Sequence, residues 1–133
     1  MKILSPRVHG FIDYVAVVAL AVAPSTFGLS GTPAALCYIF AILHLGLSIM
    51  TNYPMGVARV VPFTVHAGVE LGAAVLFVVS PWLFRFSGDG VARNLLVAFG
   101  LLLAGVWAIT DYKAAQIAAE KEAQSLRERT SEL

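Results

Sequence analysis

The stretch VVPFTVHAGVELGAAVLFVVSPWLF, residues 60–84, decides the fold of this chain. A helix that crosses a bilayer core of about 30 Å needs about 20 consecutive and mostly apolar residues, and this stretch provides them. Glu70 is its only Asp, Glu, Lys or Arg. The stretch therefore predicts a transmembrane helix, and its few polar residues need an explanation of their own.

Three further stretches, residues 11–27, 32–50 and 91–109, have the same apolar character. The chain of 133 residues is 59% hydrophobic and only 13% charged, whereas a soluble domain has about 25% charged residues. We therefore predict an all-α protein, in which residues 1–113 form a four-transmembrane-helix bundle. The first span also has features of a cleavable signal peptide, but Asp13 and Pro24 argue against cleavage.

The last segment, residues 114–133, differs from the rest of the chain. It is rich in Ala, Glu, Lys, Arg and Gln, which are good helix formers, and its apolar positions are sparse. We expect a charged cytoplasmic C-terminal helix or tail. The four spans and this tail use the whole chain, so no room remains for a soluble catalytic module, and no enzymatic activity is expected.

The chain also aligns with itself, residues 8–54 (repeat 1) with residues 65–113 (repeat 2). Aliphatic matches between apolar helices carry little weight, so the case depends on the rarer residue types. These matches are His9 with His66, Asp13 with Glu70, Pro24 with Pro81, Ser30-Gly31 with Ser87-Gly88, and Thr51-x-Tyr53 with Thr110-x-Tyr112. They predict an internal duplication, in which two tandem hairpins of the same orientation are related by an axis along the membrane normal.

The tripeptide Ser80-Pro81-Trp82 ends the third span, inside a duplicated two-helix unit that begins with His-x-x-x-acid. In these features the chain resembles the SPW-repeat family of small bacterial integral membrane proteins. The first repeat keeps only the proline of the tripeptide, as Ala23-Pro24-Ser25. The resemblance implies a fold and a membrane location, but it brings no reaction, cofactor or catalytic residue.

The basic residues near the span ends predict the orientation. One side of the membrane would carry Lys2, Arg7, Arg59 and Lys113, and the other side only Arg85 and Arg93. Cytoplasmic loops carry the excess of Lys and Arg, so we expect both termini in the cytoplasm. The predicted location is the bacterial inner membrane, with multiple passes.

Several ionisable residues lie within the predicted spans, where a central charged side chain costs about 2.5–3.5 kcal/mol. His9 with Asp13, and His66 with Glu70, are spaced four residues apart and can therefore meet on one helix face. At about 1.5 Å of rise per residue, several of these groups have overlapping depths in the cytoplasmic half of the bundle. We predict an intramembrane polar cluster of His9, Asp13, His44, His66 and Glu70. Gly68 and Gly72 flank Glu70 and predict close packing of a neighbouring helix.

Two classes of function remain open at this point. In the favoured one, the His–acid pairs are packing devices in a structural or interaction subunit that contacts the lipid bilayer and either self-associates or joins a larger membrane complex. No cofactor and no nucleic-acid partner would then be expected. In the alternative, the cluster is a functional site that relays protons or a small solute, binds a metal ion through His44, His66 and Glu70, or binds haem between His44 and His66.

Overall fold

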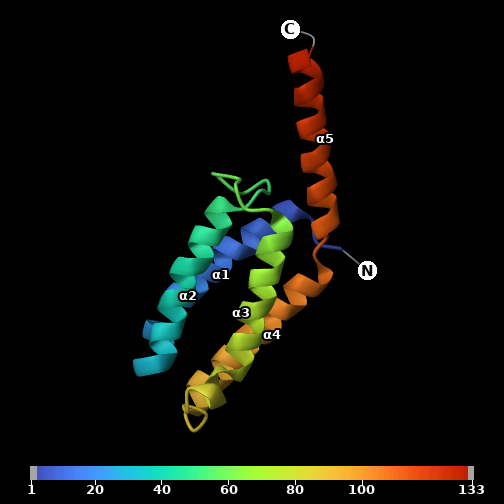
Figure 1. The fold of residues 1–133 in the computed structure, drawn as a ribbon. Coiled ribbons are helices and arrows are strands. Elements are labelled where there is room, and N and C mark those ends of the chain that lie inside the picture. The colour runs from blue at the N-terminus through green and yellow to red at the C-terminus, as the bar shows by residue number, and fades with distance from the viewer. Residues whose placement is uncertain (1–2, 132–133) are drawn as a thin grey trace.

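The computed structural model describes residues 3–131, apart from the side chains of residues 115 and 119, and within that range it contains helices and no strands (Figure 1). In chain order the elements are α1 (Pro6–Phe27), α2 (Gly31–Met50), α3 (Phe63–Leu83), α4 (Gly90–Ile109) and α5 (Tyr112–Ser131). The helices α1 to α4 form a bundle, and α5 projects from one end of it (Figure 1).

The four bundle helices are each long and apolar enough to cross a membrane. This confirms the predicted all-α four-helix bundle, with shifts at two helix starts. The first helix begins earlier than predicted because Ser5 accepts a hydrogen bond from Val8 N and Pro6 occupies the first turn, where a missing N–H costs little. The third helix begins later than predicted, after Pro62.

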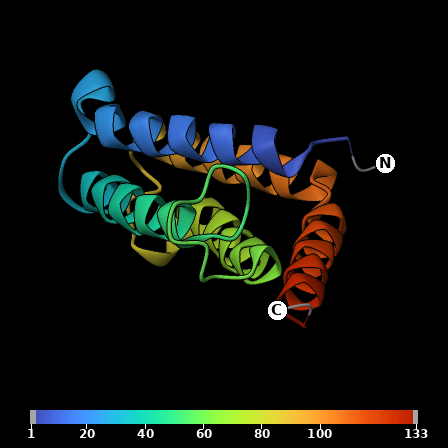
Figure 2. The same cartoon turned by 90° about the horizontal axis from the view of Figure 1, so that it is seen from above.

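The bundle is built from two helical hairpins. The helix α1 packs mainly against α2, and α3 mainly against α4, whereas α2 and α3 contact each other sparsely. Gly28 ends α1 in the left-handed conformation, with φ of 65°, which favours glycine. Asp89 caps α4 by accepting hydrogen bonds from Val91 N and Ala92 N. Seen from above, the four helices run side by side and α5 stands at one end (Figure 2).

The two hairpins are joined at the end from which α5 projects. Ile3 N and Leu4 N donate to Ile109 O, at the end of α4. In the same way, Val60 N and Val61 N donate to Met50 O, at the end of α2. The segments that precede α1 and α3 therefore make equivalent backbone contacts, each with the end of a second helix of a hairpin.

The tripeptide of the third span has a local structural explanation. Pro81 lies inside α3 and has no N–H, so it leaves the carbonyl of Phe77 without its usual helical donor. The hydroxyl of Ser80 donates to that same carbonyl oxygen at 2.9 Å. Ser80 thus supplies a hydrogen bond to the Phe77 carbonyl in place of the N–H that Pro81 lacks. Trp82 is 59% exposed on the helix surface.

The two glycines that flank Glu70 do not pack against a neighbouring helix of this chain. Gly68 and Gly72 are exposed, and a Cβ atom added at either would meet nothing within 4 Å. The reason is geometric, because Glu70 faces the bundle interior and its glycine neighbours face outward. The close approach between helices occurs instead at Gly100 of α4, where an added Cβ would lie 2.7 Å from the carbonyl oxygen of Ala74 in α3.

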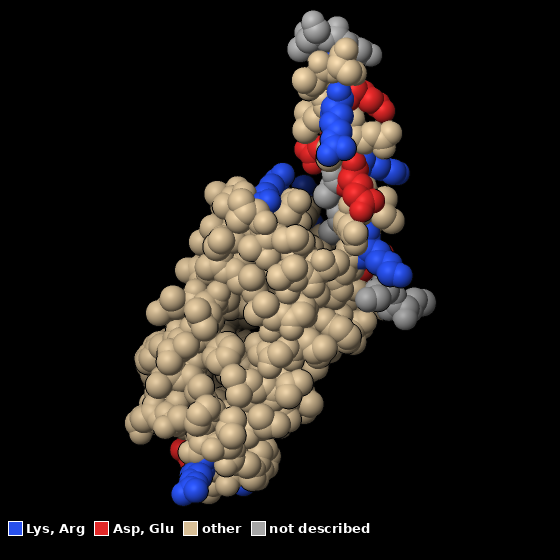
Figure 3. Space-filling model, viewed as in Figure 1, with Lys and Arg blue, Asp and Glu red and all other residues tan. Residues whose placement is uncertain are grey.

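The surface divides into an uncharged body and charged ends. In the face shown in Figure 3, Lys, Arg, Asp and Glu gather along α5 and at the two ends of the bundle, and the body between them has none. Large apolar side chains are exposed along α1 to α4, among them Phe11, Ile42, Leu43 and Leu101. This distribution is that of a multi-pass membrane protein, whose apolar side chains contact lipid.

Candidate functional site

The structure brings all five residues of the predicted polar cluster together. They come from three helices, α1, α2 and α3, and lie in the half of the bundle nearest to α5. His9 and His66 are fully buried, Asp13 and Glu70 are each 1% exposed, and the side chain of His44 is 10% exposed. The depth argument from the sequence therefore identified residues that meet.

The carboxyl group of Asp13 lies at the centre of the cluster. Its Oδ1 atom is 3.3 Å from His9 Nε2 and 3.4 Å from His44 Nε2, and its Oδ2 atom is 3.5 Å from His66 Nε2. Glu70 Oε2 is 3.5 Å from His9 Nε2. Of the two predicted i,i+4 pairs, only His9–Asp13 forms an ion pair among the described residues. His66 instead faces the acid of the first hairpin, and Glu70 faces the histidine of the first hairpin.

Two threonines orient the buried imidazoles. Thr51 Oγ1 lies 2.6 Å from Leu47 O and 2.8 Å from His66 Nδ1. A hydroxyl has one hydrogen and a carbonyl can only accept, so Thr51 donates to Leu47 O and accepts from Nδ1–H of His66. The Nε2 atom of neutral His66 then carries a lone pair, and that atom is the one directed at the carboxylates.

The same arrangement occurs at the other buried histidine. Thr110 Oγ1 donates to Val106 O at 2.7 Å and accepts from His9 Nδ1–H at 2.9 Å. The threonine after α2 thus orients the histidine of α3, and the threonine after α4 orients the histidine of α1. Each hairpin supplies the group that orients the histidine of the other hairpin.

Two tyrosines donate to the two carboxyl groups. The hydroxyl of Tyr53 donates to Asp13 Oδ2 at 2.9 Å, and the hydroxyl of Tyr112 donates to Glu70 Oε2 at 2.9 Å. Both tyrosines lie outside the spans and are nearly buried, at 3% and 7% exposure. Burial, and then the adjacent carboxylate, raise the pKa of each phenol, so both remain protonated donors at neutral pH.

Several polar atoms at the centre of the cluster have no hydrogen-bond partner among the described residues. They are His9 Nε2, His44 Nε2, His66 Nε2 and Glu70 Oε1. The nitrogen–oxygen separations of 3.3–3.5 Å are long for an N–H···O bond, whose usual range is about 2.7–3.2 Å. They match the separation of about 3.3–3.4 Å between two ligands of a tetrahedral metal ion with bonds of about 2.0–2.1 Å.

The ligand atoms form two overlapping triads. His9, His66 and Glu70 make one triad, and Asp13, His44 and His66 make the other, with the ligand atoms of each triad within 4.8 Å of one another. One imidazole nitrogen has one lone pair and His66 belongs to both triads, so the geometry suits a single ion. The sequence names His44, His66 and Glu70 as the ligands if a metal binds. The structure places His44 and Glu70 in different triads, each of which also contains His66, with His9 or Asp13 as the third member.

The threonines and tyrosines were not predicted as site residues. The sequence did contain a pattern that points to them, because Thr-x-Tyr recurs at residues 51–53 and 110–112. By itself that match supports only the duplication. Their contribution depends on contacts between the end of one hairpin and the start of the other, which neither helix periodicity nor depth can reveal.

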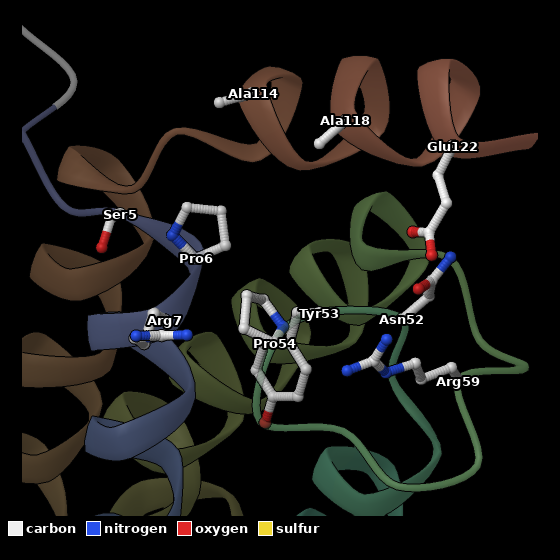
Figure 4. A pocket seen from close by; sticks show the side chains of 10 residues that line it. All are labelled: Ser5, Pro6, Arg7, Asn52, Tyr53, Pro54, Arg59, Ala114, Ala118 and Glu122. Carbon is white, nitrogen blue, oxygen red and sulfur yellow. The ribbon is translucent and has the colours of Figure 1, made fainter. Parts of the chain in front are cut away.

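A cavity of about 420 Å³ lies between α5 and the end of the bundle (Figure 4). Arg7, Arg59 and Glu122 are the charged residues that line it, so its formal charge is positive and does not suit a cation. Tyr53 also lines this cavity, while its hydroxyl bonds to Asp13 in the cluster. The side chain of Tyr53 therefore separates the cavity from the polar cluster and contacts both.

Comparisons of this chain with protein-family models, curated proteins and solved structures found no match. The fold and the site themselves define the class, which is a multi-pass membrane protein with a buried cluster of imidazoles and carboxyl groups.

Proposed function

We propose that this protein holds one divalent transition-metal ion in its buried cluster. The observation that carries the proposal is the orientation of the two buried imidazoles. Thr51 and Thr110 accept from the Nδ1–H groups, which leaves Nε2 lone pairs facing two carboxyl groups. Metal-bound histidines almost always donate their second ring N–H to such a partner, which fixes the tautomer and the ring orientation.

The donor set specifies the chemistry of the ion. Three imidazole nitrogens and two carboxyl groups suit Zn²⁺, Fe²⁺ or Mn²⁺, and Cys37, the only cysteine, is not part of the cluster. His66 would bind in every arrangement, because it is shared by both triads. Tyr53 and Tyr112 would orient the carboxyl ligands by donating to one oxygen of each.

The same geometry argues against a purely structural cluster. A packing device gains stability when its buried polar atoms are satisfied, and each unsatisfied one costs about 1–3 kcal/mol. Among the residues that the structure describes, three imidazole nitrogens and Glu70 Oε1 have no hydrogen-bond partner. Haem does not fit, because the carboxyl group of Asp13 lies within 3.5 Å of both His44 Nε2 and His66 Nε2 and occupies the place of a porphyrin plane between them.

The proposal includes a location and an origin. Residues at the end from which α5 projects include most of the basic side chains near the spans, which supports cytoplasmic termini in a bacterial inner membrane. The matched contacts of Thr51 and Thr110, and of Tyr53 and Tyr112, support a duplicated hairpin of the SPW-repeat kind. Association with itself or with a larger membrane complex remains compatible with this function.

Metal analysis of the protein purified in mild detergent tests the proposal. After incubation with Zn²⁺, Fe²⁺ or Mn²⁺ and removal of free ion, we expect about one ion per chain, as for a single closed site. His66→Ala and Glu70→Gln should lose it, whereas Glu122→Gln, which removes an acid exposed on α5, should not. A wild-type protein that retains none of the three ions would refute the proposal.

A further inference from the structure

A groove on the lipid-facing side of the bundle reaches the polar cluster. It has a volume of about 440 Å³ and lies between α2 and α3, the two neighbouring helices that contact each other sparsely. Figure 3 shows a hollow in the uncharged body, in the region where Figure 1 places these helices. Its volume is in the range of about 300–1,000 Å³ that is usual for small-molecule sites.

Only two ionisable residues line the groove, His44 and Glu70. The rest of its lining is apolar, with Phe40, Leu43 and Val69 among it. Glu70 is 1% exposed, and its Oε1 atom has no hydrogen-bond partner among the described residues, while Oε2 accepts from Tyr112. The groove thus reaches a buried carboxyl group, one oxygen of which has no hydrogen-bond partner among the described residues.

This lining selects the chemistry of the ligand. An apolar groove that opens to lipid suits a molecule with a hydrocarbon tail. The unpartnered carboxyl oxygen requires a hydrogen-bond donor at the head of the ligand. A fatty acid is disfavoured, because its carboxylate would meet Glu70 in a groove that no Lys or Arg lines. A quinone ring offers only acceptors, whereas a hydroquinone offers two hydroxyl donors.

We infer that the groove between α2 and α3 binds a lipid-soluble hydroquinone, with one ring hydroxyl donating to Glu70 Oε1 and the alkyl tail lying along the apolar lining toward lipid. The inference concerns binding and needs no ion in the cluster, although a bound ion would lie next to the ring. The site goes beyond the proposed function, since it assigns an organic ligand to the apolar groove, at whose inner end lie His44 and Glu70 of the proposed ligand set.

Saturation binding of 2-decyl-1,4-benzohydroquinone to the protein in nanodiscs tests the inference, with the metal-free and the metal-loaded protein measured in parallel. Gly46 lines the groove, and a Cβ atom added there meets nothing within 4 Å, so we use Gly46→Leu to place a bulky side chain in the groove. Gly105, the repeat counterpart on α4, is equally unobstructed and does not line the groove, so Gly105→Leu is the matched control.

We expect saturable binding that Gly46→Leu weakens by about tenfold or more and Gly105→Leu leaves unchanged. Glu70→Gln should weaken binding by about tenfold in the metal-free protein, where loss of an ion cannot explain the change. The decyl benzoquinone and decanoic acid should bind more weakly than the hydroquinone.

The inference is overturned if binding does not saturate, if both leucine variants behave alike, or if the quinone binds as tightly as the hydroquinone. Metal analysis of the same samples shows separately whether the proposed function holds.

Discussion

His66 and Glu70 occupy one face of α3, yet each is partnered across the bundle. His66 Nε2 lies 3.5 Å from Asp13, and Glu70 Oε2 lies 3.5 Å from His9. Thr51 accepts from the far side of the His66 ring. At the scale of the residue, other helices satisfy only part of each group: His66 Nδ1 and Glu70 Oε2 have hydrogen-bond partners, whereas His66 Nε2 and Glu70 Oε1 have none among the described residues. A carboxyl group and an imidazole so arranged are held in fixed orientations, which is what a metal ligand requires.

The orienting role of Thr51 leads to a first prediction. Thr51→Val keeps the shape of the side chain but removes the acceptor for His66 Nδ1–H, so metal affinity should fall by about 10–100-fold. Thr51→Ser keeps the hydroxyl and should restore most of the affinity. Thr26→Val, at an exposed threonine with a comparable bond to a helix carbonyl, is the control. Competition with a chelator of known affinity measures the change, and equal affinities in Thr51→Val and wild type would contradict the orienting role.

The buried tyrosines predict a loss of stability at alkaline pH. The pKa of Tyr53 and Tyr112 is raised in the folded state, chiefly by burial, so the unfolded chain ionises first as the pH rises. Their stabilising effect is complete below the unfolded pKa of about 10 and then declines by about 1.4 kcal/mol per pH unit for each tyrosine.

Thermal unfolding in detergent at several pH values measures this effect. The double variant Tyr53→Phe with Tyr112→Phe should be less stable than wild type at neutral pH, because two hydrogen bonds to carboxyl groups are lost. Above about pH 10 its stability should decline less steeply than that of wild type. Parallel declines in the two proteins would show that these phenols do not control the alkaline transition.

At the scale of the element, contact between α3 and α4 depends on a glycine that the sequence did not single out. A Cβ atom at Gly100 would lie 2.7 Å from Ala74 O and 2.9 Å from a methyl group of Val78. Gly100→Ala should therefore separate the two helices and cost about 1–3 kcal/mol. Gly105→Ala on the same helix meets nothing within 4 Å and is the control. Unfolding in denaturant measures both, and an unchanged stability of Gly100→Ala would refute the close approach.

The helices also show which features of the structure the sequence could predict and which it could not. Hydrophobic length predicted the four helices to within a few residues, because a bilayer sets the length of any span. Helix rise predicted that Asp13, His44, His66 and Glu70 share a depth. Spacing also implies that Gly68 and Gly72 face away from Glu70, because two residues turn a helix by about 200°. The rotation of one helix relative to another is set by packing, so the pairing of His66 with Asp13 and of Glu70 with His9 could not be obtained from spacing alone.

At the scale of the whole molecule, the two hairpins contact each other at the polar cluster and at their ends. The start of each hairpin contacts the end of the other, through backbone bonds such as Leu4 N to Ile109 O and through the bond of His9 to Thr110. The ion that we propose would add ligands from both hairpins to this junction. Binding of that ion would therefore stabilise the contact between the two hairpins, as metal binding is coupled to folding at many buried sites.

The last prediction concerns the topology of the whole chain in its membrane. With four spans, residues 51–62 and α5 lie on one side, and the turn between α3 and α4 lies on the other. In a Cys37→Ala background, Val57→Cys and Gly88→Cys place one exposed thiol on each side, because Val57 is 77% exposed and Gly88 is also exposed.

A membrane-impermeant maleimide should label Gly88→Cys in bacterial spheroplasts and Val57→Cys only in inverted vesicles, because the basic residues favour a cytoplasmic location for residues 51–62. Ser125→Cys in α5 should follow Val57→Cys. Reversed labelling of all three variants would preserve the four spans but refute the orientation. Labelling of Val57→Cys and Gly88→Cys from the same side would show that α3 does not cross the membrane. The buried cluster would then need another explanation, because its place inside the bilayer depends on a bundle that crosses it.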